Sequence, residues 1–443
     1  MIKQTIFTFK EKFNSDQLKI LSNMSWLFSE RIFRMGTGFL ILAWTARYLG
    51  VDQFGTLNYA IAFVALFSPI VQLASDQIIF RDLIQKSDLK NTILGTSFLI
   101  KSIAGIAIFV LATLTILLIQ NENSIVLKLV IIVGTSSFFS GFSTIEQWFQ
   151  SQVDSKYTIL ARNSSFIVST ILRLILFRLH APVEYFAWLV VIELFLNSLG
   201  FIFVFQASGN DILKWKFNRR YSQDLMQVSF PLIFSSLAIV IYMRIDQVML
   251  GQLASAQSVG IYSAAVKLSE IWPFASTVIV KSLAPSIILE KESSEYNYYR
   301  KLQRLCNFQA CLVYIIAIPM IFLSKPFVVL VFGSEYSAAG VILSIHIWSS
   351  MFLFLGYVKE IWITTEGITW FAFAFTVSGA IMNVILNYLL IPIYQEVGAA
   401  LATVISYAFA DYVMCFIHPQ ARRFGWMMTQ AMSLGLIKAK NTL

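Results

Sequence analysis

Basic residues lie inside stretches of this chain that are otherwise apolar enough to cross a lipid bilayer. They are Arg31, Arg34, Lys101, Arg162, Arg173, Arg244, Lys267 and Lys281. A cation held in hydrocarbon costs about 3 kcal/mol on insertion scales, so it persists mainly where it lines a watery cavity or binds something negative. The residue types therefore predict a protein that handles an anion, and guanidinium suits a diphosphate because its planar fork makes bidentate hydrogen bonds.

Helical geometry predicts which of these charges share a face. On one helix Arg162 and Arg173 lie in a narrow sector with Ser165 and Ser169. This stripe is expected to line a polar passage.

The first and sixth apolar stretches each carry a carboxylate. Glu30 can reach Arg34 on one face, with Arg31 beside them, and Glu193 shares a face with Asn197 further along the chain. A Glu30–Arg34 ion pair that only fixes helix packing is the alternative to a substrate-binding role for these side chains.

The seventh and eighth stretches continue the pattern. Lys267, Glu270 and Lys281 share a face, and Lys267 and Glu270 are one turn apart and able to pair. Arg244 and Asp246 point to opposite sides of their helix, so each needs its own partner. A mainly cationic passage bounded by the first, fifth, seventh and eighth helices is the resulting prediction.

Two further interpretations apply to particular charges. Lys101, Arg162 and Lys281 lie near helix ends and could reach the headgroups instead of a cavity. Lys267 and Glu270 could form a purely structural pair. The leading substrate-binding candidates are Arg31, Arg34, Arg244 and Lys267, with Arg162, Arg173 and Lys281 completing the set.

Carboxylates inside the apolar stretches suggest a source of energy. Asp246, Glu270 and Asp411 are candidate proton or sodium carriers, because a desolvated carboxylate can titrate near neutrality. Their alternative role is that of counterions. The chain has no Gly-rich phosphate loop, so an ion gradient or the membrane potential is the expected energy source.

Composition assigns the fold class. With 57% hydrophobic and 13% charged residues the chain is expected to be an all-α polytopic membrane protein. The apolar runs are long and continuous, which disfavours a β-barrel. About twelve windows of spanning length are predicted at 22–46, 54–75, 92–119, 125–148, 157–178, 185–206, 226–251, 258–285, 304–331, 338–361, 368–391 and 397–418.

The remaining cations predict the orientation. The connections that follow even-numbered spans, together with both tails, contain 21 basic residues. The opposite side of the membrane contains four, Arg47, Lys128, Arg178 and Lys325. Segments rich in Lys and Arg stay in the cytoplasm, so both termini are predicted there. The net charge of +9 then reflects topology and attraction to anionic membrane lipids, and no nucleic-acid partner is expected.

No cleavable signal is expected at the N terminus, because the chain is polar up to Lys19 and the first apolar run has spanning length. Neither the cysteines nor the histidines have the spacing of a metal or redox motif, so no metal and no cofactor is expected. These residues are Cys306, Cys311, Cys415, His180, His346 and His418.

The chain divides into two six-helix lobes, expected at 1–206 and 226–418, with a cytoplasmic linker at 207–225 and a cytoplasmic interfacial tail at 419–443. A weak internal repeat supports this division. The segment 48–60 resembles 253–265, a displacement of 205 residues that aligns Gly55 with Gly260. Parallel repeats with a substrate site between the halves are a recurring transporter plan.

Several segments, in order along most of the chain, resemble polysaccharide flippases. The strongest is 387–407, NYLLIPIYQEVGAALATVISY, which is similar to the family pattern N-x-x-L-I-P-x-Y-G-x-x-G-A-A-x-A-T, although Gln395 replaces its first Gly. Supporting segments are 47–50 with 54–55, 146–150 and 332–336. On these residues the chain resembles the Wzx-type lipid-linked oligosaccharide flippases, whose superfamily also contains multidrug exporters and peptidoglycan-precursor flippases.

The resemblance implies a non-enzymatic transporter in the bacterial inner membrane. The implied substrate is an undecaprenyl-diphosphate-linked oligosaccharide, such as an O-antigen repeat unit, carried by alternating access. The implied partners are a polysaccharide polymerase and chain-length machinery. Alternatives are a peptidoglycan-precursor flippase, a multidrug exporter, whose cationic substrates would favour a carboxylate-rich cavity, or a membrane polysaccharide polymerase. Candidate sugar-binding residues are Trp148, Trp272, Tyr262, Asn383 and Asn387, whereas Gly50, Gly55, Gly398, Ala399, Ala400 and Ala402 are expected to serve packing.

Overall fold

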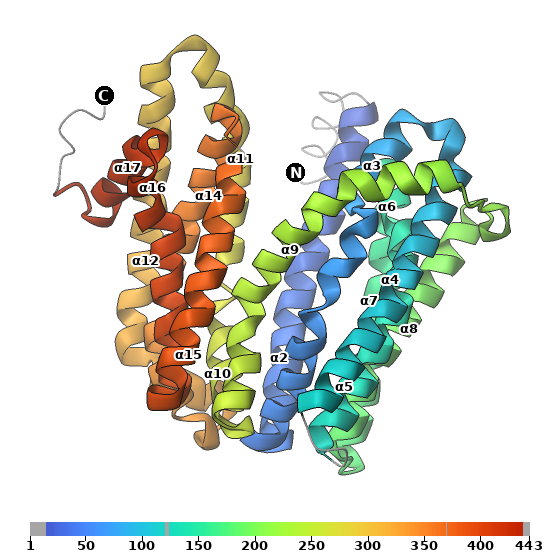
Figure 1. Cartoon of the computed structure of the whole chain (residues 1–443), viewed down its shortest axis with the longest axis horizontal. Coiled ribbons are helices and arrows are strands. Elements are labelled where there is room, and N and C mark those ends of the chain that lie inside the picture. The colour runs from blue at the N-terminus through green and yellow to red at the C-terminus, as the bar shows by residue number, and fades with distance from the viewer. Residues whose placement is uncertain (1–14, 120–123, 369, 437–443) are drawn as a thin grey trace, which may run out of the picture. The chain divides into compact units, whose positions relative to one another are not determined.

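The computed structural model describes residues 15–119, 124–368 and 370–436. Lys3, Lys10 and Lys12, which are among the 21 basic residues counted for the orientation, and the last residues of the predicted tail lie outside these ranges. The described residues form helices and turns without a β-strand, which confirms the all-α prediction (Figure 1). The helices are α2 (Ser15–Ala65), η1 (Ser68–Ala74), α3 (Asp76–Gln85), η2 (Ser87–Leu89), α4 (Lys90–Ile119), α5 (Ile125–Gly134), η3 (Thr135–Phe142), α6 (Ser143–Ser151), α7 (Lys156–Arg178), α8 (Val183–Ala207), η4 (Ile212–Lys214), α9 (Arg219–Leu253), α10 (Ala256–Ser269), α11 (Pro273–Ser293), α12 (Glu295–Phe332), η5 (Ser334–Tyr336), α13 (Ala339–His346), α14 (Ser349–Glu366), α15 (Trp370–Tyr407), the π-helical η6 (Ala408–Val413), α16 (Met414–Ile417), η7 (Pro419–Ala421) and α17 (Arg422–Met432).

Ten helical segments of the described residues are long and apolar enough to span a membrane. The difference from the twelve predicted windows arises at α2 and at the segment that begins with α15, because each joins two windows into one helical run. Gly50 (φ 69°, ψ 174°) interrupts the first of these runs, and Gln395 (φ 49°, ψ −127°) interrupts the second. Both interruptions fall where the sequence predicted a turn between two spans.

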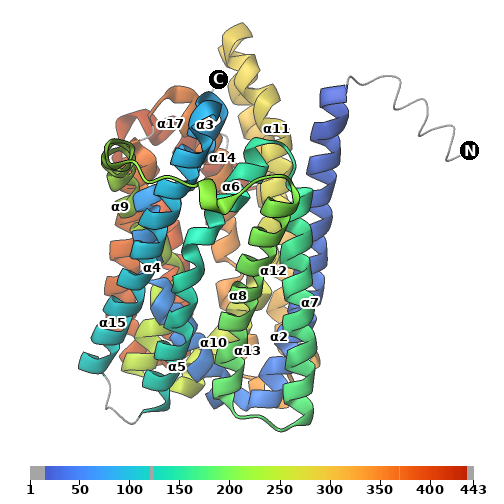
Figure 2. The ribbon, with the colours of Figure 1, turned by 90° about the vertical axis from the view of Figure 1, so that its right-hand side faces the viewer.

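The chain forms two compact units. Unit 1 contains the chain up to Thr45 and residues Phe63–Leu237, and unit 2 contains Ala46–Ala62 and Ala238–Leu443. Within unit 1, α7 packs along α8 and α4 packs along α5, as Figure 2 shows. Within unit 2, α12 contacts α11, α13, α14 and α17. The boundary between the units falls inside α2 and α9.

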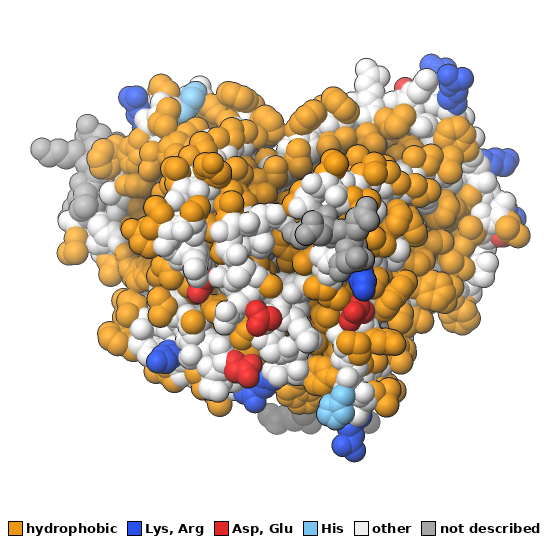
Figure 3. Space-filling model, turned by 60° about the horizontal axis from the view of Figure 1, so that its bottom comes forward, with side chains coloured by type: hydrophobic (Ala, Val, Ile, Leu, Met, Phe, Trp, Pro, Cys, Tyr) orange, Lys and Arg blue, Asp and Glu red, His pale blue; other side chains and the backbone are white. Residues whose placement is uncertain are grey.

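Large apolar side chains are exposed along many helices. Leu118 of α4 and Phe322 of α12 are 89% and 77% exposed, and hydrophobic side chains cover much of the surface seen in Figure 3. Such a surface is costly in water but favourable in hydrocarbon. The exposed apolar helices therefore support a multi-pass membrane protein.

The C-terminal helix α17 belongs to the core of unit 2. Phe424 and Met428 are fully buried, and Phe424 stacks on Trp362 of α14 with ring centroids 5.5 Å apart. The guanidinium of Arg423 lies 3.4 Å from the ring centroid of Tyr299. The described part of the predicted tail is thus attached to unit 2 by packing as well as by charge.

The repeated segments contact each other reciprocally within unit 2. A Cβ on Gly55 would lie 1.8 Å from the carbonyl oxygen of Ala256, and a Cβ on Gly260 would lie 2.2 Å from that of Val51. The displacement of 205 residues relates Gly55 to Gly260 and Val51 to Ala256, so the two contacts are equivalent. Gly55 therefore serves close backbone packing, as the sequence predicted.

The linker that follows α8 is docked on the first turns of α4. Its backbone binds there twice, since Lys216 N donates to Asn91 O and Asn218 N donates to Thr96 Oγ1, each at 3.0 Å. A Cβ on Gly95 would lie 2.7 Å from Lys216 N, so a larger residue would displace the linker. This segment of the predicted linker is therefore held on unit 1.

Candidate functional site

Arg162 of α7 joins three helices of unit 1. Its Nη1 donates to Glu146 Oε1 of α6 at 2.7 Å, and its Nη2 lies 3.3 Å from Glu30 Oε2 of α2. The alternative in which Glu30 pairs with Arg34 is therefore wrong. Glu30 of α2 pairs with Arg162 of the neighbouring helix α7 instead of with Arg34 of its own helix.

In unit 1, one arginine binds Glu193 directly and a second lies within its electrostatic influence. Arg34 Nη2 of α2 donates to Glu193 Oε1 of α8 at 2.9 Å, and its guanidinium lies 5.1 Å from the ring centroid of Phe166. Glu193 also acts electrostatically on Arg173 of α7, whose Nε is buried without a hydrogen-bond partner in the described part of the chain. One carboxylate cannot neutralise both arginines, so the group retains a positive charge. Arg31, in the preceding turn of α2, is exposed.

Lys101 has a structural environment. Its side chain is 1% exposed, and its ammonium binds Asp76 and donates to Ser143 Oγ. Such burial contradicts the alternative in which Lys101 extends to the headgroups. The pair joins α3, α4 and α6 of unit 1.

In unit 2, Glu270 lies between two cations. Lys267 Nζ is 3.4 Å from Glu270 Oε2, which confirms that these residues can pair, and Arg244 Nη1 is 3.9 Å from Glu270 Oε1. All three side chains are about one-third exposed, so the pairs are partly open to exchange. Lys281 on α11 is exposed.

Asp246 of α9 has separate partners on the opposite side, as predicted. Tyr262 Oη and Thr403 Oγ1 each lie 2.6 Å from Asp246 Oδ2, and Asn387 Nδ2 donates to Oδ1 at 2.5 Å. Asp246 is 4% exposed. Because Asn387 is fully buried in this group, it is not available to a sugar as the sequence analysis suggested, and neither is the fully buried Asn383 that it contacts.

Lys359 is a buried cation that the sequence analysis missed. Its Nζ lies 2.7 Å from Asp411 Oδ1 and 3.2–3.3 Å from the carbonyl oxygens of Asp411 and Ala410, and it lies 4.3 Å from the ring centroid of Phe375. Lys359 stands two residues from the end of the predicted window 338–361 and was counted with the following connection. The signal for it was Asp411, which needs a counterion inside an apolar stretch.

The segment around Asp411 is unusual. Residues Ala408–Val413 form a π-helical stretch, a feature that is rare and frequent at functional sites. A Cβ on Gly356 would lie 3.0 Å from Asp411 Oδ1, so the glycine provides space for the carboxylate.

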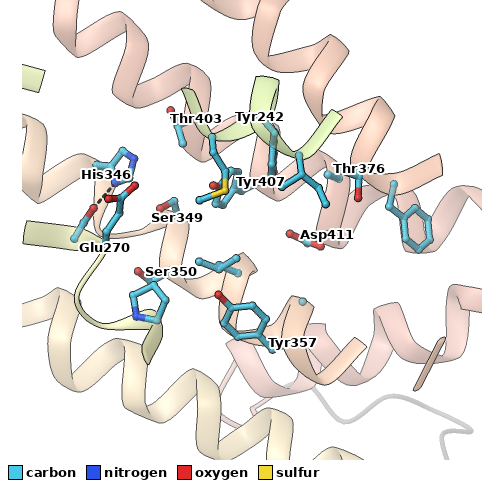
Figure 4. A pocket seen from close by; sticks show the side chains of 18 of the residues that line it. Tyr242, Glu270, His346, Ser349, Ser350, Tyr357, Thr376, Thr403, Tyr407 and Asp411 are labelled. Atoms are coloured by element: carbon cyan, nitrogen blue, oxygen red, sulfur yellow. Dashed lines mark hydrogen bonds between the residues drawn. The ribbon is translucent and has the colours of Figure 1, made fainter. Parts of the chain in front are cut away.

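A cavity of about 640 Å³ in unit 2 connects these groups. Figure 4 shows Tyr357, Tyr407 and Asp411 around it, and the rings of Tyr242 and Tyr407 stack with centroids 4.3 Å apart. Among the described residues that line it, four are acidic and two are basic. The acidic residues are Asp246, Glu270, Glu360 and Asp411, and the basic ones are Arg244 and Lys359. The wall is thus richer in carboxylates than the cationic passage predicted from the sequence.

Comparison with known proteins identifies the family. A family model described as polysaccharide biosynthesis protein matches residues 20–288, more than half of the chain. The chain belongs to this family. The match runs from α2 into α11, so it includes most of unit 1 and the helices that carry Arg244, Asp246 and Glu270. The resemblance to polysaccharide flippases stated from the sequence is confirmed at this level.

A relative and two solved structures extend the comparison. "Probable flippase AglR" from Haloferax volcanii is 25% identical over 186 residues, which cover 41% of this chain and 38% of AglR. The chain is similar to lipid II flippase MurJ in an inward closed conformation, with a TM-score of 0.72 at 15% identity over 95% of this chain and 94% of MurJ. It is also similar to an inward-facing multidrug resistance MATE family transporter of the MOP superfamily, with a TM-score of 0.68 at 14% identity over 91% of this chain and 95% of that transporter. The chain has the fold of these transporters.

Proposed function

We propose that the chain flips an undecaprenyl-diphosphate-linked oligosaccharide, the repeat unit of O-antigen or a similar surface polysaccharide, across the bacterial inner membrane. Membership of the polysaccharide biosynthesis family and the fold of lipid-carrier flippases support this substrate class. The observation that carries the proposal is the pair Arg34–Glu193 together with the buried Arg173 Nε, which has no hydrogen-bond partner among the described residues, so that two guanidiniums inside membrane helices lie near one carboxylate.

An arriving diphosphate would replace Glu193 as the partner of these arginines. The buried Nε of Arg173 is a ready donor, and two planar forks can each bind a phosphate in bidentate fashion. Glu193 would preserve the pair between cycles by reducing the repulsion between the two guanidiniums. The full set of proposed substrate-binding residues is Arg31, Arg34, Arg162, Arg173, Arg244, Lys267 and Lys281.

Coupling is proposed to occur through carboxylates of unit 2. Asp246, Glu270 and Asp411 line the cavity, whose acidic surplus favours binding of a proton or a small cation. The two six-helix halves would alternate between openings to the cytoplasm and to the outside. Asp246→Asn removes the titratable group while keeping an acceptor for Tyr262 and Thr403. We expect it to uncouple transport from the ion gradient without unfolding the protein, and unchanged gradient dependence would contradict a coupling role.

Complementation of a flippase-null strain of matching polysaccharide type tests the proposed substrate site. We expect the wild-type chain to restore polymer and the Arg34→Ala and Arg173→Ala variants to lose it, at equal membrane abundance. Arg178→Ala is the matched control, because Arg178 is exposed on the same helix as Arg173. Normal polymer from the double variant Arg34→Ala/Arg173→Ala would exclude this pair as the diphosphate site.

Export of organic cations is the second candidate function. The acidic surplus of the unit 2 cavity, together with the stacked Tyr242 and Tyr407, is the environment that a cationic aromatic compound would prefer. Efflux of a cationic dye by the wild-type chain, abolished by Glu270→Gln, would favour this function. A peptidoglycan-precursor flippase would instead rescue a strain that lacks its own precursor flippase, and a polymerase would lengthen lipid-linked units in a purified system.

A further inference from the structure

A second cavity, of about 530 Å³, lies in unit 1 where α6 and α8 end. Its wall combines aromatic rings with hydrogen-bonding side chains. The rings include Trp148, Tyr157 and Phe203, and the polar groups include Gln152, Asp154 and Asn210. Its lining residues include neither Arg34 nor Arg173, and the proposed function does not use it.

Lysines surround this cavity. Lys90 Nζ lies 4.3 Å from the ring centroid of Trp148 and donates to Asn210 Oδ1. Lys156 Nζ lies 4.8 Å from the ring centroid of Tyr157. Each ammonium is therefore held at an aromatic ring of the wall by a cation–π contact.

A third lysine reaches the same wall from α2. Lys19 Nζ donates to the carbonyl oxygen of Gln152 at 2.8 Å and lies 3.6 Å from Asp154, which Lys156 approaches to 3.9 Å. Two lysines thus face Asp154, and Lys90 contacts the wall at Trp148 and Asn210, so three ammonium groups contact lining residues that include one carboxylate. The surplus of positive charge favours a ligand that carries phosphate.

The turn between α6 and α7 is strained at the cavity. Val153, between the lining residues Gln152 and Asp154, has φ 56°, which is a genuine outlier for a β-branched residue. The strain is maintained by hydrogen bonds from Asp154 N to Phe149 O at 2.9 Å and from Ser155 N to Asn23 Oδ1 at 2.8 Å. Strain of this kind clusters at ligand clamps, and here it directs two polar side chains of neighbouring residues to the cavity.

We propose that this cavity is the docking subsite for the sugar phosphate head of the lipid-linked substrate, an inference that rests on the proposed function. The apolar face of a sugar ring packs on aromatic side chains, and its hydroxyls pair with amide and carboxylate groups. Trp148 and Tyr157 offer the rings, Gln152 and Asn210 offer the amides, and the lysines bind the phosphate. The sugar would rest here before its diphosphate reaches Arg34 and Arg173.

Photocrosslinking in the polymer-producing host identifies the occupant. The photoreactive residue p-benzoylphenylalanine replaces Phe203, which lines the cavity and is 71% exposed. The matched control carries it in place of Phe322 of unit 2, which is 77% exposed. We expect a glycan-bearing adduct at position 203, at least about tenfold more abundant than at position 322, whose mass falls after mild acid cleaves the diphosphate.

Further substitutions in the chain that carries the photoreactive residue at position 203 test whether adduct formation depends on the residues of the cavity wall. Trp148→Ala is expected to lower it about tenfold and Trp148→Phe to retain most of it, because the ring remains. Gln152→Ala, at an exposed position that folding tolerates, should lower it several-fold. Equal adducts from Trp148→Ala, Gln152→Ala and the parent chain would overturn the subsite.

The chemical identity of the adduct also distinguishes between the possible ligands of the cavity. A soluble nucleotide sugar, a prenyl lipid without glycan, a peptide, or no adduct at position 203 would each overturn the proposal. If the wild-type chain restores polymer but the chain labelled at position 203 captures no glycan, the subsite fails and the flippase function stands. If the wild-type chain does not restore polymer and the labelled chain captures no glycan, both fail.

Discussion

Removal of the Lys359 ammonium should destabilise unit 2 strongly. Lys359 is 4% exposed and provides donors to Asp411 Oδ1 and to two carbonyl oxygens of the π-helical segment. Lys359→Met preserves the length of the side chain but leaves the Asp411 carboxylate, which is 19% exposed, without its counterion. Breaking a buried pair from one side costs about 3–5 kcal/mol.

The cost can be measured as a loss of thermal stability in detergent. Unfolding midpoints of domains of this size shift by about 2–4 °C per kcal/mol, so Lys359→Met should lower the midpoint by about 6 °C or more. Lys359→Met/Asp411→Asn removes both charges and should recover much of the loss. Lys291→Met is the control, because Lys291 and Glu366 form a partly exposed pair, 2.8 Å apart, worth about 1 kcal/mol at most.

Two results would refute this reasoning. Lys359→Met could be no more destabilising than Lys291→Met, which would mean that water or another cation replaces the ammonium. The double variant could also be less stable than Lys359→Met, which would mean that the Asp411 carboxylate stabilises the fold even without Lys359.

Three further features of the fold are tested by substitution in the same unfolding measurement. Gln395→Gly should raise the free energy of unfolding by about 0.5–1 kcal/mol, because glycine adopts the positive φ without strain; a loss of stability would show that the Gln side chain matters more. Gly55→Ala should destabilise by about 1–3 kcal/mol because its Cβ would collide with backbone, whereas Gly36→Ala, with nothing within 4 Å, should stabilise by up to about 1 kcal/mol. Asp76→Ala should destabilise the protein more than Lys101→Met does. Asp76→Ala leaves the Lys101 ammonium, which is 1% exposed, without its carboxylate, whereas Lys101→Met leaves the Asp76 carboxylate, which is 43% exposed and can be hydrated. A larger loss of stability from Lys101→Met would contradict a structural role for the buried ammonium.

Relations between residues of one helix could be predicted from the sequence. The pairing of Lys267 with Glu270 and the opposite directions of Arg244 and Asp246 both follow from 3.6 residues per turn, and the structure confirms them. The lengths of the apolar stretches likewise predicted the membrane helices, because the length of such a stretch is a property of that segment alone.

Pairs between residues of different helices could not be predicted in this way. Glu30 pairs with Arg162 rather than with Arg34, because the packing of α2 against α7 is not encoded in the periodicity of either. Lys359 was missed for a related reason. Whether a cation two residues from a helix end is buried depends on the neighbouring segment, here the π-helical turn that carries Asp411.

The reciprocal contact of Gly55 and Gly260 bears on how such a chain can arise. A surface that fits its own copy is sufficient to bring two identical subunits together about a two-fold axis, because each contact is made twice. Here the two copies lie 205 residues apart in one chain, and each glycine faces the backbone of the other copy. An ancestor with one copy of this segment could have paired with itself by the same contact. Duplication and fusion of its gene would then have preserved an interface that already existed, provided that both positions remained glycine.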